Sequence, residues 1–178
     1  MEPPVTLRPL QLADLGRVDQ LLREPQVARW WTSDTTAERE LERFRRRLVE
    51  PAETATRMYA VELGGTLVGW CQWYRWQDYP SEAAAVGAGR GEVGADYAVG
   101  DPGAIARGVG TRMVAALVSE IWRHEPQAGL LVAPQAANTA SRRVLEKNGF
   151  LLVEVRPVST EPHNRPMAIY RLGPPPAS

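Results

Sequence analysis

Apolar and polar residues alternate along this chain with two different periods, and these periods outline an α/β protein. Alternation with period two, or a short apolar run, predicts strands over residues 5–10, 57–63, 66–74, 92–99, 129–133, 150–155 and 167–172. Apolar residues three and four apart predict helices over residues 12–22, 36–49, 111–123 and 138–148. Strands interspersed with helices indicate a central sheet with helices packed on it.

Glycine, proline and asparagine mark where these elements begin and end. Gly64-Gly65 between two strands predicts a tight hairpin, because a type I′ turn needs a positive φ at both positions. Asn138 is expected to cap the last helix, and Gly149 to follow its end. Pro25 is expected to end the first helix, so residues 26–34 and 75–91 are interpreted as connections.

Length and charge restrict the class of protein. The chain has 178 residues, which suits one domain over residues 1–173 followed by a Pro-rich, flexible tail at 174–178. Lys plus Arg and Asp plus Glu both number 21, a balance that argues against a nucleic-acid binder. The single cysteine, Cys71, excludes an intrachain disulfide, and two histidines leave little for a metal site. We expect no transmembrane helix, because no apolar run reaches ~18 residues. We expect no signal peptide, because Met1-Glu2-Pro3-Pro4 carries an acid and two prolines where a signal peptide needs a basic and then an apolar stretch. These expectations imply no membrane partner and a cytoplasmic location.

A glycine-rich segment between a predicted strand and a predicted helix is the sharpest local signal for binding. It reads Arg107-Gly108-Val109-Gly110-Thr111. Backbone N–H groups in such a turn can converge on a phosphate, and the helix N-terminus adds about half a positive charge. The segment is neither a Walker loop nor a dinucleotide fingerprint, since Gly-Lys-Ser/Thr and a third glycine are missing. Alone, it fits a phosphate site and a plain tight turn equally well.

The segment from Asn138 to Phe150 resembles the closing segment of the GNAT acetyltransferase superfamily. It carries Asn138, a small residue three positions on, and an ending Glu-Lys-Asn-Gly-Phe. The resemblance implies a GNAT acetyltransferase domain with a mixed, mostly antiparallel sheet, splayed at the cofactor site and flanked by helices. It also implies acetyl-CoA as cofactor. The implied cofactor residues are the backbone of Tyr97, Ala98 and Val99 along the pantetheine arm, the loop Arg107, Gly108, Val109, Gly110 and Thr111 on the pyrophosphate, and Asn138, Ser141 and Lys147 on the last helix.

Upstream residues are similar to those of aminoglycoside 6′-N-acetyltransferases, a subgroup of the same superfamily. These enzymes carry an acid at the position of Asp96, a Trp pair like Trp30-Trp31 and a Gln-x-Tyr like Gln72-Trp73-Tyr74. The resemblance implies direct attack by a primary amine of the antibiotic on acetyl-CoA in a ternary complex. Two positions depart from the pattern: Leu145 stands where a Tyr general acid is common, and Ala133 stands where the subgroup often has Asp.

The chemistry of amide formation supports Asp96 as the catalytic residue. The amine arrives as an ammonium, and a nearby carboxylate can bind that cation and take its proton, directly or through water. A carboxyl with a reference pKa of ~3.9 is a weak base, so positioning and charge stabilisation can count for more than proton abstraction. A surface carboxylate without a catalytic role is the alternative interpretation of Asp96.

Charge and aromatic residues suggest where the acceptor binds. Residues 71–101 hold five acids against two arginines, a local charge of −3 that suits a cationic amino sugar. Trp73 is expected in the core, whereas Trp30, Tyr74 and Trp76 fit either a core or a sugar-stacking role. The predicted substrate-binding residues are Trp30, Trp31, Gln72, Tyr74, Asp78, Glu82 and Asp96.

Two other functions are compatible with the same sequence. A lysine N-acyltransferase acting on a siderophore precursor would share the architecture, although such proteins typically place His where Asp96 stands. A GNAT-like protein that binds CoA without catalysis would explain Leu145 and Ala133. Pairing of the last strands would allow a homodimer.

Overall fold

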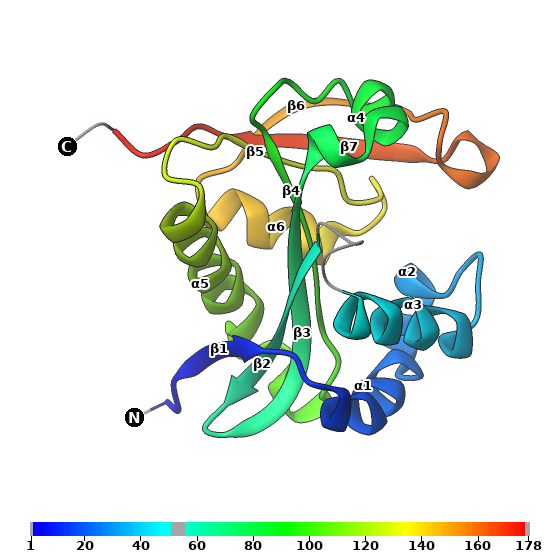
Figure 1. Ribbon diagram of the computed structural model, residues 1–178, viewed down its shortest axis with the longest axis vertical. Coiled ribbons are helices and arrows are strands. Elements are labelled where there is room, and N and C mark those ends of the chain that lie inside the picture. The colour runs from blue at the N-terminus through cyan, green and yellow to red at the C-terminus, as the bar shows by residue number, and fades with distance from the viewer. Residues whose placement is uncertain (1, 51–55, 177–178) are drawn as a thin grey trace. The chain divides into compact units, whose positions relative to one another are not determined.

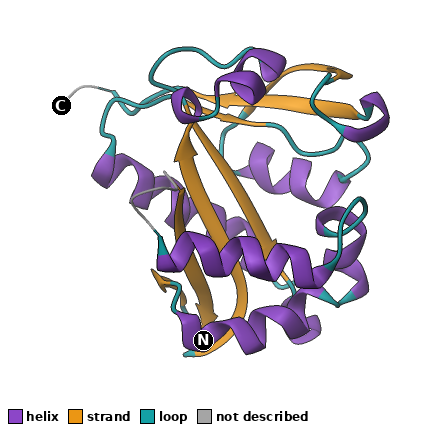
Figure 2. Ribbon diagram, turned by 45° about the vertical axis from the view of Figure 1, so that its right-hand side comes forward, coloured by secondary structure: helices purple, strands orange, loops and turns teal. Residues whose placement is uncertain are grey.

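The computed structural model describes residues 2–50 and 56–176 (Figure 1). The strands are β1 (Val5–Pro9), β2 (Thr56–Leu63), β3 (Thr66–Arg75), β4 (Val93–Val99), β5 (Leu130–Val132), β6 (Leu151–Pro157) and β7 (Pro166–Leu172). The helices are α1 (Leu15–Leu22), α2 (Pro25–Trp31), α3 (Ala37–Val49), α4 (Pro80–Val86), α5 (Val109–His124) and α6 (Thr139–Lys147). Figure 2 colours the same chain by secondary structure.

The strands form one seven-stranded sheet in the order β1-β2-β3-β4-β5-β7-β6. β1 pairs antiparallel with β2, and β7 pairs antiparallel with both β5 and β6. β4 and β5 are parallel, with Val93 opposite Leu130. The mixed, mostly antiparallel sheet and its helices confirm the predicted fold class.

The chain divides into two compact units. Unit 1 comprises residues 1–72 and 97–117, and unit 2 comprises residues 73–96 and 118–178. β3, β4 and α5 each continue from one unit into the other. Residues on one strand can therefore belong to different units.

The core of unit 1 is built around an aromatic cluster. The ring of Trp31 makes edge contacts with Phe44 and Trp70, with centroids 5.9 and 5.2 Å apart. Apolar residues of α1, α3 and β2 complete this core. β3 and β4 approach closely beside it, since a Cβ added at Gly69 would lie 2.1 Å from the Ala98 carbonyl oxygen. Glycine is required at position 69, because any side chain would push the two strands apart.

The core of unit 2 joins β5 and β7 to α4. Leu131, Met167 and Ile169 pack against Val86 of α4 and against Trp76. The Trp76 indole N–H donates to the Leu131 carbonyl at 3.0 Å, so this ring belongs to the core. Trp73 is 2% exposed, which confirms its predicted core position.

Two segments predicted as connections contain helices. Pro25 was predicted to end the first helix, but it lies in the first turn of the next helix, α2. Proline is tolerated there because N–H groups in the first turn of a helix have no intrahelical acceptor. Pro80 begins α4 in the same way, and Gly87, with φ of +73°, ends that helix. Both predictions of irregular structure, at residues 26–34 and 75–91, were therefore wrong in part.

Two other local signals are confirmed. Gly64 and Gly65 both have positive φ in the β2–β3 turn, and Asn138 caps α6. Among the described residues, none of the helices is both long enough and apolar enough to span a bilayer.

Candidate functional site

The glycine-rich loop lies directly before α5, within unit 1. Gly108 has φ of +69°, and its carbonyl accepts the Arg112 N–H at 3.1 Å, which starts the helix. Ala106 also has a positive φ, +60°, so two left-handed residues flank exposed Arg107. Turns with left-handed residues can direct backbone N–H groups to one side, and the opening amides of a helix have no intrahelical acceptor. Both features occur in loops that bind phosphate, and phosphate binding by this loop stays a prediction.

Side chains fix this loop from within unit 1. The Asp101 carboxylate accepts the Gly103 N–H at 2.8 Å and pairs with Arg17 at 2.5 Å. Arg107 donates to the Gly103 carbonyl at 3.1 Å, and Arg112 donates to the Arg107 carbonyl at 3.4 Å. These contacts hold the loop through the Gly103 amide and through the carbonyls of Gly103 and Arg107. A side chain at Gly108 would meet no atom within 4 Å, so the space beside the turn is open.

β4 leads into this loop and carries the predicted catalytic residue. Gly100 N and Asp101 N both donate to the Val68 carbonyl, at 2.9 and 3.1 Å, which anchors the end of the strand on β3. Tyr97, Ala98 and Val99 form the last three residues of β4 in unit 1. Asp96 belongs to unit 2, where its side chain is half-buried and is not free of interaction partners.

Tyr74 in unit 2 lies across the strand that holds Asp96. A Cβ added at Gly94 would lie 2.4 Å from a Tyr74 ring carbon and 2.9 Å from its hydroxyl oxygen. Gly94 and Asp96 are two residues apart on a strand, so both face the side where the Tyr74 ring lies. The Tyr74 ring is 5.2 Å from both Trp76 and Tyr79, each in an edge contact. Tyr74, Trp76 and Tyr79 form an aromatic platform that reaches Gly94 through the Tyr74 ring, and Tyr79 is a member that the sequence interpretation missed.

The acidic residues of segment 71–101 include two that are paired with arginines and two that are exposed. Glu92 binds Arg171 at 2.9 Å and the Gly89 N–H at 2.6 Å, so it holds unit 2 together. Asp101 pairs with Arg17 in unit 1. The sequence count of −3 therefore overstated the charge offered to a substrate. Asp78 and Glu82 are exposed, in the turn before α4 and on α4.

The remaining predicted acceptor residues lie in unit 1. Trp31 belongs to the aromatic core described above. The Arg29 guanidinium lies 4.8 Å from the centre of the Trp30 ring, a cation–π contact within α2. Gln72 is 3% exposed, and its Oε1 accepts from Arg47 at 2.8 Å. Arg47 therefore places a cation beside a predicted acceptor residue, a contact between positions 25 residues apart that no local sequence signal indicates.

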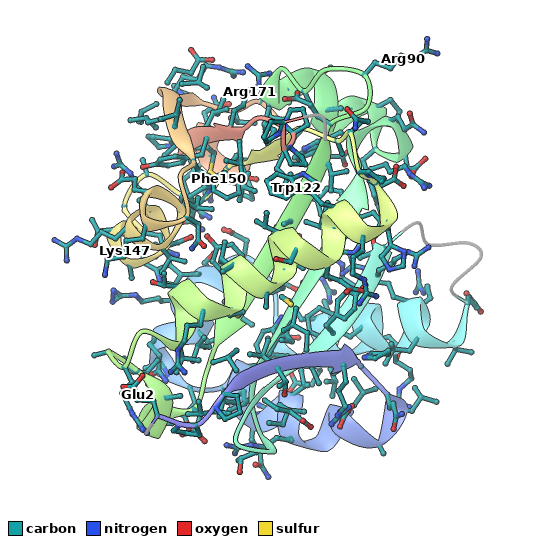
Figure 3. All side chains as sticks on the ribbon, turned by 90° about the vertical axis from the view of Figure 1, so that its left-hand side faces the viewer. Glu2, Arg90, Trp122, Lys147, Phe150 and Arg171 are labelled. Atoms are coloured by element: carbon teal, nitrogen blue, oxygen red, sulfur yellow. The ribbon has the colours of Figure 1, made fainter. Side chains whose placement is uncertain are left out.

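α6 contains the predicted cofactor residues of unit 2. The Asn138 Oδ1 accepts the Ser141 N–H at 3.1 Å, so this side chain serves as the helix cap. Lys147 is exposed and points away from α6 (Figure 3). Leu145 is fully buried, which fits a packing role in place of a general acid.

A tyrosine from β7 contacts the same helix. The Tyr170 hydroxyl donates to Glu146 at 2.7 Å and accepts from Arg142 Nε at 3.0 Å. Burial raises the pKa of Tyr170 above its usual value. The Tyr170 hydroxyl proton is donated to Glu146, and the residue is fully buried. Tyr170 therefore links β7 to α6 and does not take the general-acid role of the tyrosine that is common at position 145.

Among the described residues, His, Cys, Asp and Glu do not gather into a group of three or more that could hold a metal ion.

Comparisons with known proteins place this arrangement in a family. The chain is 27% identical over 177 residues, 97% of its length, to the lysine N-acyltransferase MbtK of Mycobacterium tuberculosis, of which 79% is covered. The fold matches aminoglycoside acetyltransferase AAC(6')-Ib in complex with coenzyme A and kanamycin, with a TM-score of 0.74, 22% identity and coverage of 95% and 94% of the two chains. It also matches a Salmonella typhimurium acetyltransferase that modifies the N-terminal serine of ribosomal protein L7/L12, with a TM-score of 0.74, 13% identity and coverage of 96% and 95%.

The family itself follows from a match across most of the sequence. Residues 5–151 match the family described as "Acetyltransferase (GNAT) domain". These residues include the glycine-rich loop, β4 with Asp96, and α6 with its Asn138 cap. The predicted superfamily is confirmed: this chain belongs to the GNAT acetyltransferase family.

Proposed function

We propose that this chain acetylates a primary amine of an aminoglycoside, at the 6′ position, with acetyl-CoA as donor. The observation that carries the proposal is the placement of Asp96 beside Gly94, on the side of β4 that faces the Tyr74 ring. An ammonium group on a sugar needs a carboxylate for its charge and an aromatic face for its ring. Unit 2 supplies both, with Asp78 and Glu82 as further exposed acids.

Acetyl-CoA is the cofactor, and it supplies the acetyl group as a thioester that an amine can attack. In unit 1, the loop from Arg107 to Thr111 would bind the diphosphate through backbone N–H groups and the positive end of α5. The backbone of Tyr97, Ala98 and Val99 would bind the pantetheine arm. In unit 2, Asn138, Ser141 and Lys147 remain predicted cofactor residues, with the Asn138 oxygen already engaged as a cap.

Asp96 would act on the amine. Its carboxylate would bind the ammonium group, hold it in place and take the proton that must leave before nitrogen can attack. The departing thiol has a reference pKa of about 8.5, so it leaves without a strong general acid. Buried Leu145 is therefore compatible with turnover.

Lysine N-acylation is the second candidate, and two observations favour it. The relative MbtK, a lysine N-acyltransferase, is similar over 97% of this chain. Arg47 beside Gln72 is a cation that would suit the carboxylate of an amino-acid acceptor and would repel a polycationic drug.

One assay distinguishes the candidates. Release of thiol from acetyl-CoA is followed with kanamycin, tobramycin, lysine and N6-hydroxylysine as acceptors. Turnover with the drugs supports the first proposal, turnover with only the lysine-type amines supports the second, and CoA binding without turnover supports a loss of catalysis. Expression in a susceptible bacterium tests resistance, because the first proposal predicts a raised inhibitory concentration for the accepted drugs.

Matched variants connect the assay to the site. Asp96→Ala is expected to abolish turnover with the accepted amine. Glu42→Gln removes a carboxylate from an exposed position on α3 and should leave it unchanged. If both variants keep full activity, Asp96 has no catalytic role and the proposal fails.

A further inference from the structure

An exposed apolar strand lies at one edge of the sheet. β6 is the last strand in the sheet order and lies beside β7 (Figure 1). Leu151 is 74% exposed, and Leu152, Val153 and Val155 are between 44% and 49% exposed. An exposed edge strand of this kind offers unpaired backbone groups and apolar surface to another strand, and proteins normally protect it with charge or cover it.

The register of β6 against β7 separates the side chains into two faces. Glu154 lies opposite Ile169 and Arg156 opposite Met167, while Val155 lies opposite Ala168. Because Ile169 and Met167 pack in the core with α4, Glu154 and Arg156 share that face of the sheet. Arg156 also donates to the Ala85 carbonyl at 2.8 Å, which confirms the face. Val155 therefore points to the opposite face.

The charges on this strand are complementary to their own copy. When two identical strands pair antiparallel about one central residue, that residue lies opposite the same residue of the second copy. The residue before it then lies opposite the residue after it in the second copy. Centring the pair on Val155 places Glu154 opposite Arg156 of the second copy, and Arg156 opposite the other Glu154. The side chains can reach each other, since within one chain Arg156 Nε lies 2.8 Å from Glu154 Oε1. Opposite charges directly across a sheet stabilise it, and so do paired β-branched residues.

We propose that β6 pairs with β6 of a second copy of this chain, antiparallel and centred on Val155. The pair would join two seven-stranded sheets along residues 153–157, cover Val153 and Val155, and form two Glu154–Arg156 contacts across a two-fold axis. A single strand pair buries a small interface, so the dimer is expected to dissociate on dilution.

Engineered cysteines test the register directly. Residues opposite each other in an antiparallel pair have Cα atoms about 4.5–5.5 Å apart, within the range of a disulfide. Val155→Cys should therefore form an intermolecular disulfide on oxidation. Leu151→Cys is the matched control, because it is more exposed but lies far from its own copy in this register. The native Cys71 is fully buried and does not interfere.

Sedimentation velocity of the full chain tests the association itself, from about 1 to about 100 µM, because small interfaces dissociate in this range. A dimer that grows with concentration is expected, with Glu154→Arg reducing its fraction and Glu154→Arg combined with Arg156→Glu restoring it. A monomer at every concentration, or equal crosslinking of both cysteine variants, overturns the proposal and leaves β6 to another partner, such as an extended peptide. If the charge variants fail to fold, crosslinking of Val155→Cys compared with Leu151→Cys still tests the proposal, because both substitutions alter exposed side chains.

Discussion

Gly94 is the position where a single methyl group should disturb the proposed acceptor site most selectively. An alanine Cβ there would lie 2.4, 2.6 and 2.9 Å from three atoms of the Tyr74 ring and hydroxyl, whereas ordinary contacts begin at 3.4 Å. The ring has to move by about 1 Å, which disturbs its edge contacts with Trp76 and Tyr79. Overpacking of this kind costs about 1–3 kcal/mol.

Two measurements follow from this displacement. For a domain of this size each kcal/mol lowers Tm by about 2–4 °C, so Gly94→Ala should melt about 2–12 °C below the parent. The KM for the accepted amine should rise, while the KM for acetyl-CoA stays the same, because Tyr74 belongs to the predicted acceptor residues and not to the cofactor residues. Thermal unfolding and initial-rate kinetics measure both effects.

A double-mutant cycle shows whether Tyr74 is the cause. In Tyr74→Ala the ring is absent, so adding Gly94→Ala to that variant should cost little stability, and the two changes should couple by more than 0.5 kcal/mol. Additive effects, or an unchanged Tm and amine KM in the single variant, would refute the argument that the ring lies against Gly94.

Three other changes have defined outcomes. Asn138→Ala removes the oxygen that accepts the Ser141 N–H, so urea denaturation should show a loss of about 1 kcal/mol in the free energy of unfolding; an unchanged midpoint would contradict the cap. Gly108→Ala puts a side chain at φ of +69° and should strain the loop by about 1–2 kcal/mol, so calorimetry should find weaker binding of CoA and unchanged binding of pantetheine, which lacks the diphosphate. The hydrogen bond from Arg8 holds the pKa of Asp14 below its usual value of 3.8. A carboxyl with a lowered folded pKa stabilises the fold above its unfolded pKa and loses that contribution as the pH falls through the folded value. Asp14→Asn should therefore be less stable than the parent at pH 6, with the difference in the free energy of unfolding shrinking toward pH 2, and a difference independent of pH would count against the ion pair.

Most of the fold could be predicted because its signals are local. The hairpin at Gly64-Gly65 and the cap at Asn138 are fixed by neighbouring residues, and the structure has both. The helix α2 was missed because Pro25 was interpreted as the end of a helix, although proline is favoured in the first helical turn. The helix α4, which also begins at a proline, was missed because residues 75–91 were interpreted as a loop. Gly87 after α4 was a further local signal, since glycine commonly follows the end of a helix.

The site was less accessible to sequence reasoning because its contacts join distant residues. Nothing near Glu92 in sequence shows that Arg171 binds it, and Asp101 pairs with Arg17, 84 positions away. Counting acids in one segment therefore overestimated the charge available to a substrate. The closeness of Tyr74 to Gly94 and of Arg47 to Gln72 is likewise a result of tertiary packing.

The kinetics of Asp96→Asn test the proposed function most directly. Asparagine keeps the shape of the side chain but cannot take a proton or neutralise an ammonium group. If Asp96 acts on the amine, kcat/KM for the accepted aminoglycoside should fall by about 10²–10⁴, while the Kd for CoA stays unchanged. A variant that turns over the amine at the parental rate would contradict the account.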